Sequence, residues 1–180
     1  MKGIEYLRKK LDKHAKRVNL RYKQYDMKYQ DADVGITIPP EIRSRYKSVL
    51  GWCAKGVDSL ADRLVFREFK NDNFEINEIF NMNNPDVFFD SAILSALIAS
   101  CCFVYISKGE GDIPRLQVIE ASNATGIIDP ITGLLKEGYA VLERNDQDKP
   151  SLEAYFTAGK TSYYKDGKFS YNIKNNVSYP

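Results

Sequence analysis

The apolar positions divide the chain into a helical first half and a strand-rich second half. The most apolar stretch, Ser91–Ser107, changes character midway. Small residues and leucines up to about Ser100 favour a helix, whereas the run Cys-Cys-Phe-Val-Tyr-Ile from Cys101 favours a strand. We therefore expect a helix over 85–100 that leads directly into a buried strand, and we expect the other segments to cover this core.

The first thirty residues form one long amphipathic helix in this interpretation. Apolar residues between Gly3 and Tyr29 recur every three or four positions and lie on one narrow stripe. A stripe this narrow resembles a coiled-coil seam. We predict that the seam packs along a partner helix or a neighbouring subunit through Leu7, Leu11, Val18, Tyr22 and Tyr25.

The opposite side of this helix is strongly basic. The first thirty residues contain ten Lys and Arg against three Asp and Glu, whereas the remaining residues contain sixteen against twenty-one. This side is either a solvated face or a contact surface for nucleic acid or an acidic partner. No aromatic residues interleave with its lysines, which argues against base stacking and leaves phosphate attraction. The candidate contact residues are Lys9, Lys10, Lys13, Lys16, Arg17 and Arg21.

The segments that follow are predicted to be a proline-bearing linker and several further helices. The linker covers 31–40, and its prolines end one helix and start the next, which runs over 41–64 with Trp52 as a half-buried anchor. A short strand is predicted over 64–69, a turn over 70–73 and a short helix over 74–82. Asn84 is then a good N-cap for the helix that starts at Pro85.

The remainder of the chain alternates between short strands and turns. Turn signals occur at 129–133 and at Asp166-Gly167, where a hairpin is expected. The predicted fold class is α+β, with N-terminal long helices followed by a mostly antiparallel β-sheet with a packed helix. The predicted domains are a basic helix over 1–30, a linker over 31–40 and an α+β body over 41–180. Strands are expected over 103–106, 115–120, 134–143, 152–157, 161–164 and 169–173.

Motifs for catalysis are absent from the sequence. It contains no GxGxxG, P-loop, CxxC or HExxH pattern, and its single histidine, His14, makes a Ser-His-Asp triad or a His-based metal site hard to build. We read Cys53, Cys101 and Cys102 as reduced, buried, small hydrophobic residues. We therefore predict a protein that is not an enzyme, with no catalytic, cofactor-binding or metal residue and no cofactor. A metal-dependent hydrolase built from scattered carboxylates stays an alternative.

The sequence gives no sign of a membrane span or a secretory signal. The longest apolar run is too short and too rich in Ser and Cys to cross a bilayer, and the basic N-terminus has no hydrophobic segment after it. We therefore expect no membrane partner.

Four motifs follow one another along the chain: Gly56-Val-Asp-Ser-Leu-Ala-Asp-Arg-Leu64, the Ala-rich stretch 92–100 entering Phe103-Val-Tyr-Ile106, Ile113-Pro-Arg-Leu-Gln-Val-Ile119 and Asp129-Pro-Ile-Thr-Gly133. Taken in this order, they resemble the N-terminal, wing-region part of a tailed-bacteriophage portal protein of the siphophage type. The chain departs from the family at Cys101-Cys102, where a Tyr-Gly or Phe-Gly pair is common.

The resemblance implies a structural subunit of a homo-oligomeric ring, usually a dodecamer, at the head vertex of the virion. Double-stranded DNA is packaged and ejected through such a ring, and capsid and head–tail connector proteins bind it. Assembly takes place in the host cytoplasm. Portal chains are longer than this one, so we expect a truncated chain with the terminase-docking region outside it. The alternative is a nucleic-acid-binding module that acts through the basic helix.

Overall fold

The structure, a computed structural model, describes residues 1–28, 51–72, 74–109, 113–175 and 180. It is a mixed α+β fold with mostly antiparallel strands, which confirms the predicted fold class. The described chain clusters into two compact units, a division that the expected domains did not anticipate. We name them the sheet unit (1–16, 102–105 and 117–180) and the helical unit (17–101 and 106–116).

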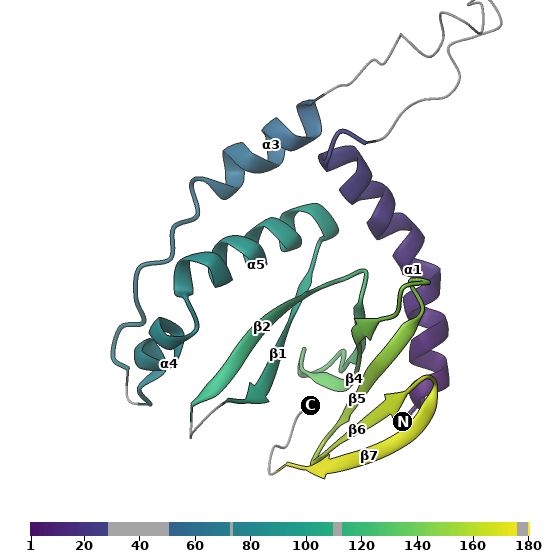
Figure 1. The fold of residues 1–180 in the computed structure, drawn as a ribbon. Coiled ribbons are helices and arrows are strands. Elements are labelled where there is room, and N and C mark those ends of the chain that lie inside the picture. Colours follow the sequence, from purple (N-terminus) through teal and green to yellow (C-terminus); the bar gives the residue numbers. More distant parts are fainter. Residues whose placement is uncertain (29–50, 73, 110–112, 176–179) are drawn as a thin grey trace, which may run out of the picture. The chain divides into compact units, whose positions relative to one another are not determined.

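The sheet unit is built on a five-stranded antiparallel meander. Its strands follow each other in chain order (Figure 1), as β3 (Ala124–Ile128), β4 (Leu135–Arg144), β5 (Pro150–Thr157), β6 (Lys160–Lys165) and β7 (Lys168–Lys174). Asp166 and Gly167 connect β6 to β7 with φ values of 49° and 76°. These left-handed conformations suit a two-residue hairpin turn, so the predicted hairpin is confirmed. The predicted turn at 129–133 is confirmed as well, with Gly133 at φ 70° and its N–H on the Asp129 carbonyl.

One face of the sheet is covered by the N-terminal half of α1 (Ile4–Tyr25). Leu7 is fully buried and Leu11 nearly so, and both pack against Tyr139 and Val141 of β4. The prediction that Leu7 and Leu11 belong to a subunit seam is therefore wrong. The N-terminal half of the narrow stripe follows a strand of the chain's own sheet.

The opposite face is contacted by the parts of β1 (Cys102–Lys108) and β2 (Pro114–Glu120) that belong to the sheet unit, residues 102–105 and 117–120. Within the sheet unit, Phe103, Tyr105 and Ile119 from this pair pack on Ala140 and Phe156. Ala140 alternates with Tyr139 along β4 and so points away from α1. The hydroxyls of Tyr105 and Tyr163 lie 2.9 Å apart, and burial raises the pKa of Tyr163.

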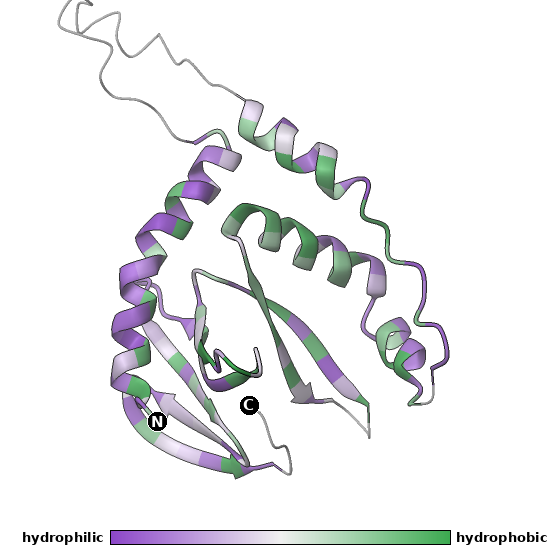
Figure 2. Cartoon of the chain, turned by 180° about the vertical axis from the view of Figure 1, so that it is seen from behind, coloured by the Kyte–Doolittle hydropathy of each residue, from purple (hydrophilic) through white to green (hydrophobic). Residues whose placement is uncertain are grey.

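The helical unit contains α3 (Trp52–Ala61), α4 (Ile76–Met82), α5 (Pro85–Ala99) and the C-terminal part of α1. α5 is apolar over most of its length, whereas polar residues dominate the surface of α1 (Figure 2). The prediction of short and long helices around 74–82 and 85–100 is confirmed. Five aromatic rings pack together in this unit, with a stacked pair 3.9 Å apart at Phe66 and Phe89; the others are Phe69, Phe80 and Phe88.

The strand predicted over 64–69 does not form. Its backbone at Phe69 instead exchanges two hydrogen bonds of 2.9 Å with the side-chain amide of Asn77, which takes the place of a strand partner. The Asp72 carboxylate accepts the N–H groups of Ile76 and Asn77 and so starts α4; these bonds lower the pKa of Asp72. Phe66 and Phe69 enter the aromatic cluster, which sets the course of this segment.

Three further expectations are corrected by burial and backbone geometry. Trp52 is 83% exposed at the first position of α3, so it is no anchor in this structure. Cys53 and Cys101 are exposed and Cys102 is partly buried, so they are not buried core residues. α5 is followed by β1 after only two residues, with Ser100 in a left-handed conformation (φ 74°), but none of the residues of β1 is buried, so this strand is not the buried one that we expected. The predicted linker and the start of the predicted helix over 41–64 lie outside the described residues.

The Asn84 N-cap is correct in position, since α5 begins at Pro85. The side chain of Asn84 makes no capping hydrogen bond, and its residue adopts a left-handed conformation (φ 55°). Asparagine tolerates this region better than most residues.

We predict that Leu7→Ala destabilises the monomeric fold, because it opens a cavity between α1 and β4. The expected loss in unfolding free energy is about 2–5 kcal/mol. Leu20→Ala is the matched control on the same helix, because Leu20 is 41% exposed, and we expect a much smaller change. Urea unfolding at several protein concentrations provides the measurement. A loss for Leu7→Ala that grows with protein concentration would instead favour an intermolecular seam.

Candidate interaction surfaces and the buried carboxylate network

Two buried glutamates hold the N-terminal half of α1 on the sheet. Glu137 of β4 and Glu153 of β5 are each 3% exposed and lie on the face that α1 covers. Their strands carry the same short pattern, Glu137-Gly-Tyr139 and Glu153-Ala-Tyr155. Tyr139 and Tyr155 are directly paired across the two antiparallel strands, so each glutamate lies diagonal to the tyrosine of the other strand.

Glu137 binds the backbone just before the start of α1. Its carboxylate accepts the backbone N–H of Lys2 at 2.7 Å and of Gly3 at 3.0 Å, and the Tyr155 hydroxyl at 2.7 Å. Burial alone would raise the pKa of Glu137, but these three hydrogen bonds outweigh it and leave the pKa below its ordinary value. A carboxylate at a helix N-terminus is also favoured by the helix dipole.

Glu153 is bound by Arg8, one turn further along α1. The guanidinium donates from Nε at 2.9 Å and from Nη2 at 2.7 Å, and the Tyr139 hydroxyl donates to the same carboxylate. The hydrogen bond to Glu153 raises the pKa of Arg8, and burial raises the pKa of Tyr139. Both carboxylates therefore have several donors, which is the arrangement that makes a buried charge tolerable. They anchor a helix, and sequence reasoning missed them although the repeated Glu-x-Tyr pattern was a usable signal.

The predicted contact residues of α1 divide into two groups. Lys10 donates to the Gly126 carbonyl at 2.5 Å, and Arg21 donates to the Ala99 carbonyl at 3.2 Å and the Ser100 hydroxyl at 2.8 Å. Arg21 thus binds the C-terminal end of α5, where a cation is favoured. The others are exposed, namely Lys9, Lys13, Lys16 and Arg17. We name Lys9, Lys13 and Lys16 the basic face.

The remaining seam residues also make contacts within the chain. Val18 is buried, and the Tyr22 hydroxyl lies 3.0 Å from that of Ser95 on α5. Tyr25 donates to Asp58 on α3 at 2.7 Å, and this hydrogen bond raises the pKa of Tyr25 to about 12. The predicted subunit seam is thus used inside the chain along its whole described length. His14, on the edge of this helix, is exposed.

A cavity of about 480 Å³ opens in the helical unit between α3, the segment after it and α5. Four carboxylates line it, two near the end of α3 and two on α5: Asp58, Asp62, Asp86 and Asp90. Apolar side chains line the same cavity, among them Phe66, Phe89, Ile93 and Leu94. We name this cavity the acidic groove. The sequence pattern alone did not bring α3 beside the acidic residues of α5.

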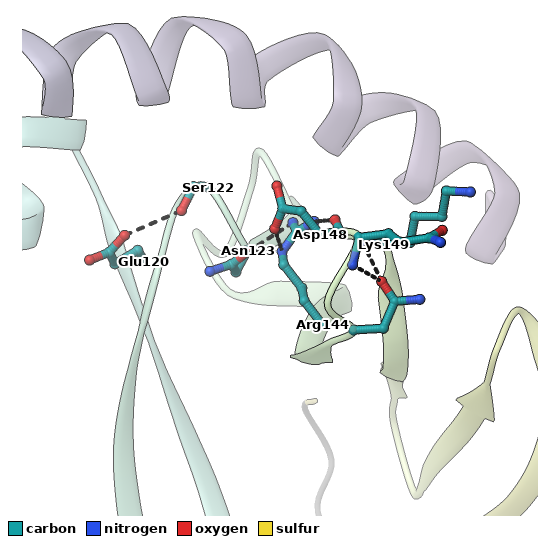
Figure 3. Close-up of polar contacts among 8 residues, drawn as sticks. Glu120, Ser122, Asn123, Arg144, Asp148 and Lys149 are labelled. Carbon is teal, nitrogen blue, oxygen red and sulfur yellow. Dashed lines mark hydrogen bonds and ion pairs between the residues drawn. The ribbon is translucent and has the colours of Figure 1, made fainter.

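A further polar cluster connects the turn between β2 and β3 with the loop that follows β4 (Figure 3). The Arg144 guanidinium donates to the Asn123 side-chain oxygen at 2.9 and 3.1 Å and to the Asp148 carbonyl at 2.8 Å. Ser122 donates to Glu120 at 3.3 Å. These bonds tie the turn after β2 to the loop after β4, which is a positioning role.

The described residues contain neither a candidate metal cluster nor a candidate membrane-spanning helix. No three His, Cys, Asp or Glu side chains among them are placed to hold a metal ion. None of the helices in the described part is at once long enough and apolar enough to cross a lipid bilayer.

We predict that Glu137 makes stability fall with acid. A carboxylate whose folded pKa is lowered stabilises the fold above its ordinary pKa, here 4.5, and loses that contribution as the pH falls through the folded value. Glu137→Gln should therefore cost about 1–3 kcal/mol near pH 7, because the amide keeps one acceptor oxygen but places an NH₂ group against a donor at the start of α1 or on Tyr155. The difference from wild type should shrink below pH 4.

Thermal unfolding between pH 7 and pH 3 measures this difference, with Glu143→Gln as the control, since Glu143 is an exposed glutamate on the same strand. An equal cost for Glu137→Gln at all pH values would contradict a role for the charged form.

Comparison of the sequence with protein-family models and with curated proteins gave no match. The portal resemblance rests on the motifs themselves.

Proposed function

We propose that this chain is a structural subunit of a phage portal ring, through which double-stranded DNA is packaged and ejected. The observation that carries the proposal is the order of the motifs. They lie on successive elements, first α3 and its end, then α5 with β1, then β2, then the turn between β3 and β4. The proposal extends to binding of capsid and head–tail connector proteins and to terminase docking by a region outside this chain.

The chemistry of the buried charges is consistent with a structural role. Glu137 and Glu153 accept hydrogen bonds from α1 and from the neighbouring tyrosines. Their charges therefore hold a helix in place. The acidic groove and the basic face are exposed features of the described residues with opposite charge. They suit a protein whose task is to bind other chains.

We expect the chain, or a version extended along its reading frame, to assemble into closed rings. Sedimentation velocity and light scattering over a wide concentration range measure its mass, and negative-stain electron microscopy shows closure. A protein that stays strictly monomeric at high concentration would overturn the proposal. An open filament would also argue against it, because a portal must close around DNA.

A second candidate function is nucleic-acid binding through α1. Its specific support is the exposure of Lys9, Lys13, Lys16 and Arg17 along one side of the helix. Phosphate attraction of this kind is independent of sequence and strongly dependent on salt.

We predict that, if α1 binds DNA, charge reversal at Lys9, Lys13 and Arg17 removes the binding. The slope of log K against log salt should fall by about 0.9 for each phosphate that the helix no longer neutralises. Fluorescence anisotropy with a labelled duplex measures this, with Lys149, Lys168 and Lys174 reversed together as the control, since all three are exposed outside α1. Equal reductions in affinity for both triple variants would show that only net charge matters.

A further inference from the structure

We propose that the acidic groove of one copy of this chain receives the basic face of α1 from a second copy. The contact deepens the proposed ring and rests on it, since each copy carries both surfaces and binds its neighbours head to tail. Contacts of this heterologous kind generate rings when the rotation between subunits closes.

The groove supplies charge and apolar surface together. Asp58 and Asp62 lie one helical turn apart, as do Asp86 and Asp90 on α5, and like charges at this spacing repel each other. Apolar side chains line the same cavity, and Leu64 and Val65 beside them are half or more exposed. No three of these carboxylates are placed to share a metal ion among the described residues. A partner whose side chains carry a positive charge at the end of an apolar chain matches this surface.

The basic face has that composition. Lys9, Lys13 and Lys16 follow each other at spacings of four and three, so they lie in one line on α1. Leu7 and Leu11 point into the sheet unit from the opposite side of the helix, so the lysines are turned outward. Lysine carries its charge on a long apolar stem, so each of the three side chains offers both kinds of surface.

Tyr25, the last residue of α1, lines the groove itself. Along the same helix, Lys16 precedes Tyr25 by nine residues, which is about 14 Å, and Lys9 lies about 24 Å away. An intermolecular contact has no such separation between the two surfaces, so we assign the basic face in the groove to a second copy. Complementary charge also steers such an encounter and makes it sensitive to salt.

The test uses two variants, each of which reverses the charge of one of the two surfaces. Lys9→Glu with Lys13→Glu reverses the helix, and Asp62→Lys with Asp90→Lys reverses the groove. Asp58 is left because it binds Tyr25, and Asp86 is left because it lies in the first turn of α5. The controls with the same change in charge are Lys149→Glu with Lys168→Glu, and Glu143→Lys with Asp146→Lys, all at exposed positions. Circular dichroism and thermal unfolding check that every variant folds.

We expect each surface variant alone to self-associate at least about tenfold more weakly than wild type in sedimentation velocity, and the controls to behave as wild type. An equimolar mixture of the two surface variants should recover assembly. In the mixture one native groove meets one native helix, and the reversed surfaces also have opposite charges.

The outcomes separate this contact from the proposed function. If wild type forms rings and the surface variants form them equally well, the contact is overturned and the ring proposal stands. If wild type associates through the contact into open filaments, the contact stands and the portal function falls. A wild type that stays monomeric overturns both. Loss of duplex DNA binding in the helix variant, without any change in self-association, also overturns the contact.

Discussion

Two buried carboxylates determine where α1 lies. Burying an unpaired charge costs several kcal/mol, so Glu137 and Glu153 are compatible with this fold only if donors meet them. The start of α1 and Arg8 supply those donors, and Tyr139 and Tyr155 complete them across the two strands. Leu7 and Leu11 then fall on the apolar surface of β4. A one-residue shift of the helix would break the charge network and misplace the leucines together.

The position of α1 decides what its other residues can do. Lys10 reaches the Gly126 carbonyl of β3, which is an edge strand whose free backbone groups invite pairing with another chain. The lysine thus closes part of that edge. Lys9, Lys13 and Lys16 project from the remaining side of the helix. A helix that looked uniformly basic in sequence therefore contains residues with structural roles beside residues that are free to bind a partner.

Local patterns predicted the elements well and their partners poorly. The turns at Gly133 and at Asp166-Gly167, the strands β4 to β7 and α5 follow from residues close in sequence, whereas β3 was not predicted. The strand prediction over 64–69 failed because contacts with residues outside this segment decide its backbone course. These contacts are the hydrogen bonds to the Asn77 side chain and the packing of its phenylalanines in the aromatic cluster. The prediction of a buried Cys101 failed because this residue lies in the two-residue connection between α5 and β1, where its side chain is exposed. In the site, the basic face was predictable from charge alone, whereas the acidic groove required α3 and α5 to be placed together.

The spacing of three and four in α1 shows why oligomer contacts are hard to infer from sequence. Such a stripe states that a helix packs along one line, but it does not distinguish a partner helix from a strand of the same chain. Burial of Leu7 against Tyr139 makes that distinction for the N-terminal half of the stripe, and it removes Leu7 and Leu11 from the surfaces available to a neighbour. A ring built from this chain then needs other surfaces. The structure offers two of opposite charge, and their presence on each copy allows every subunit to bind two neighbours in the same way.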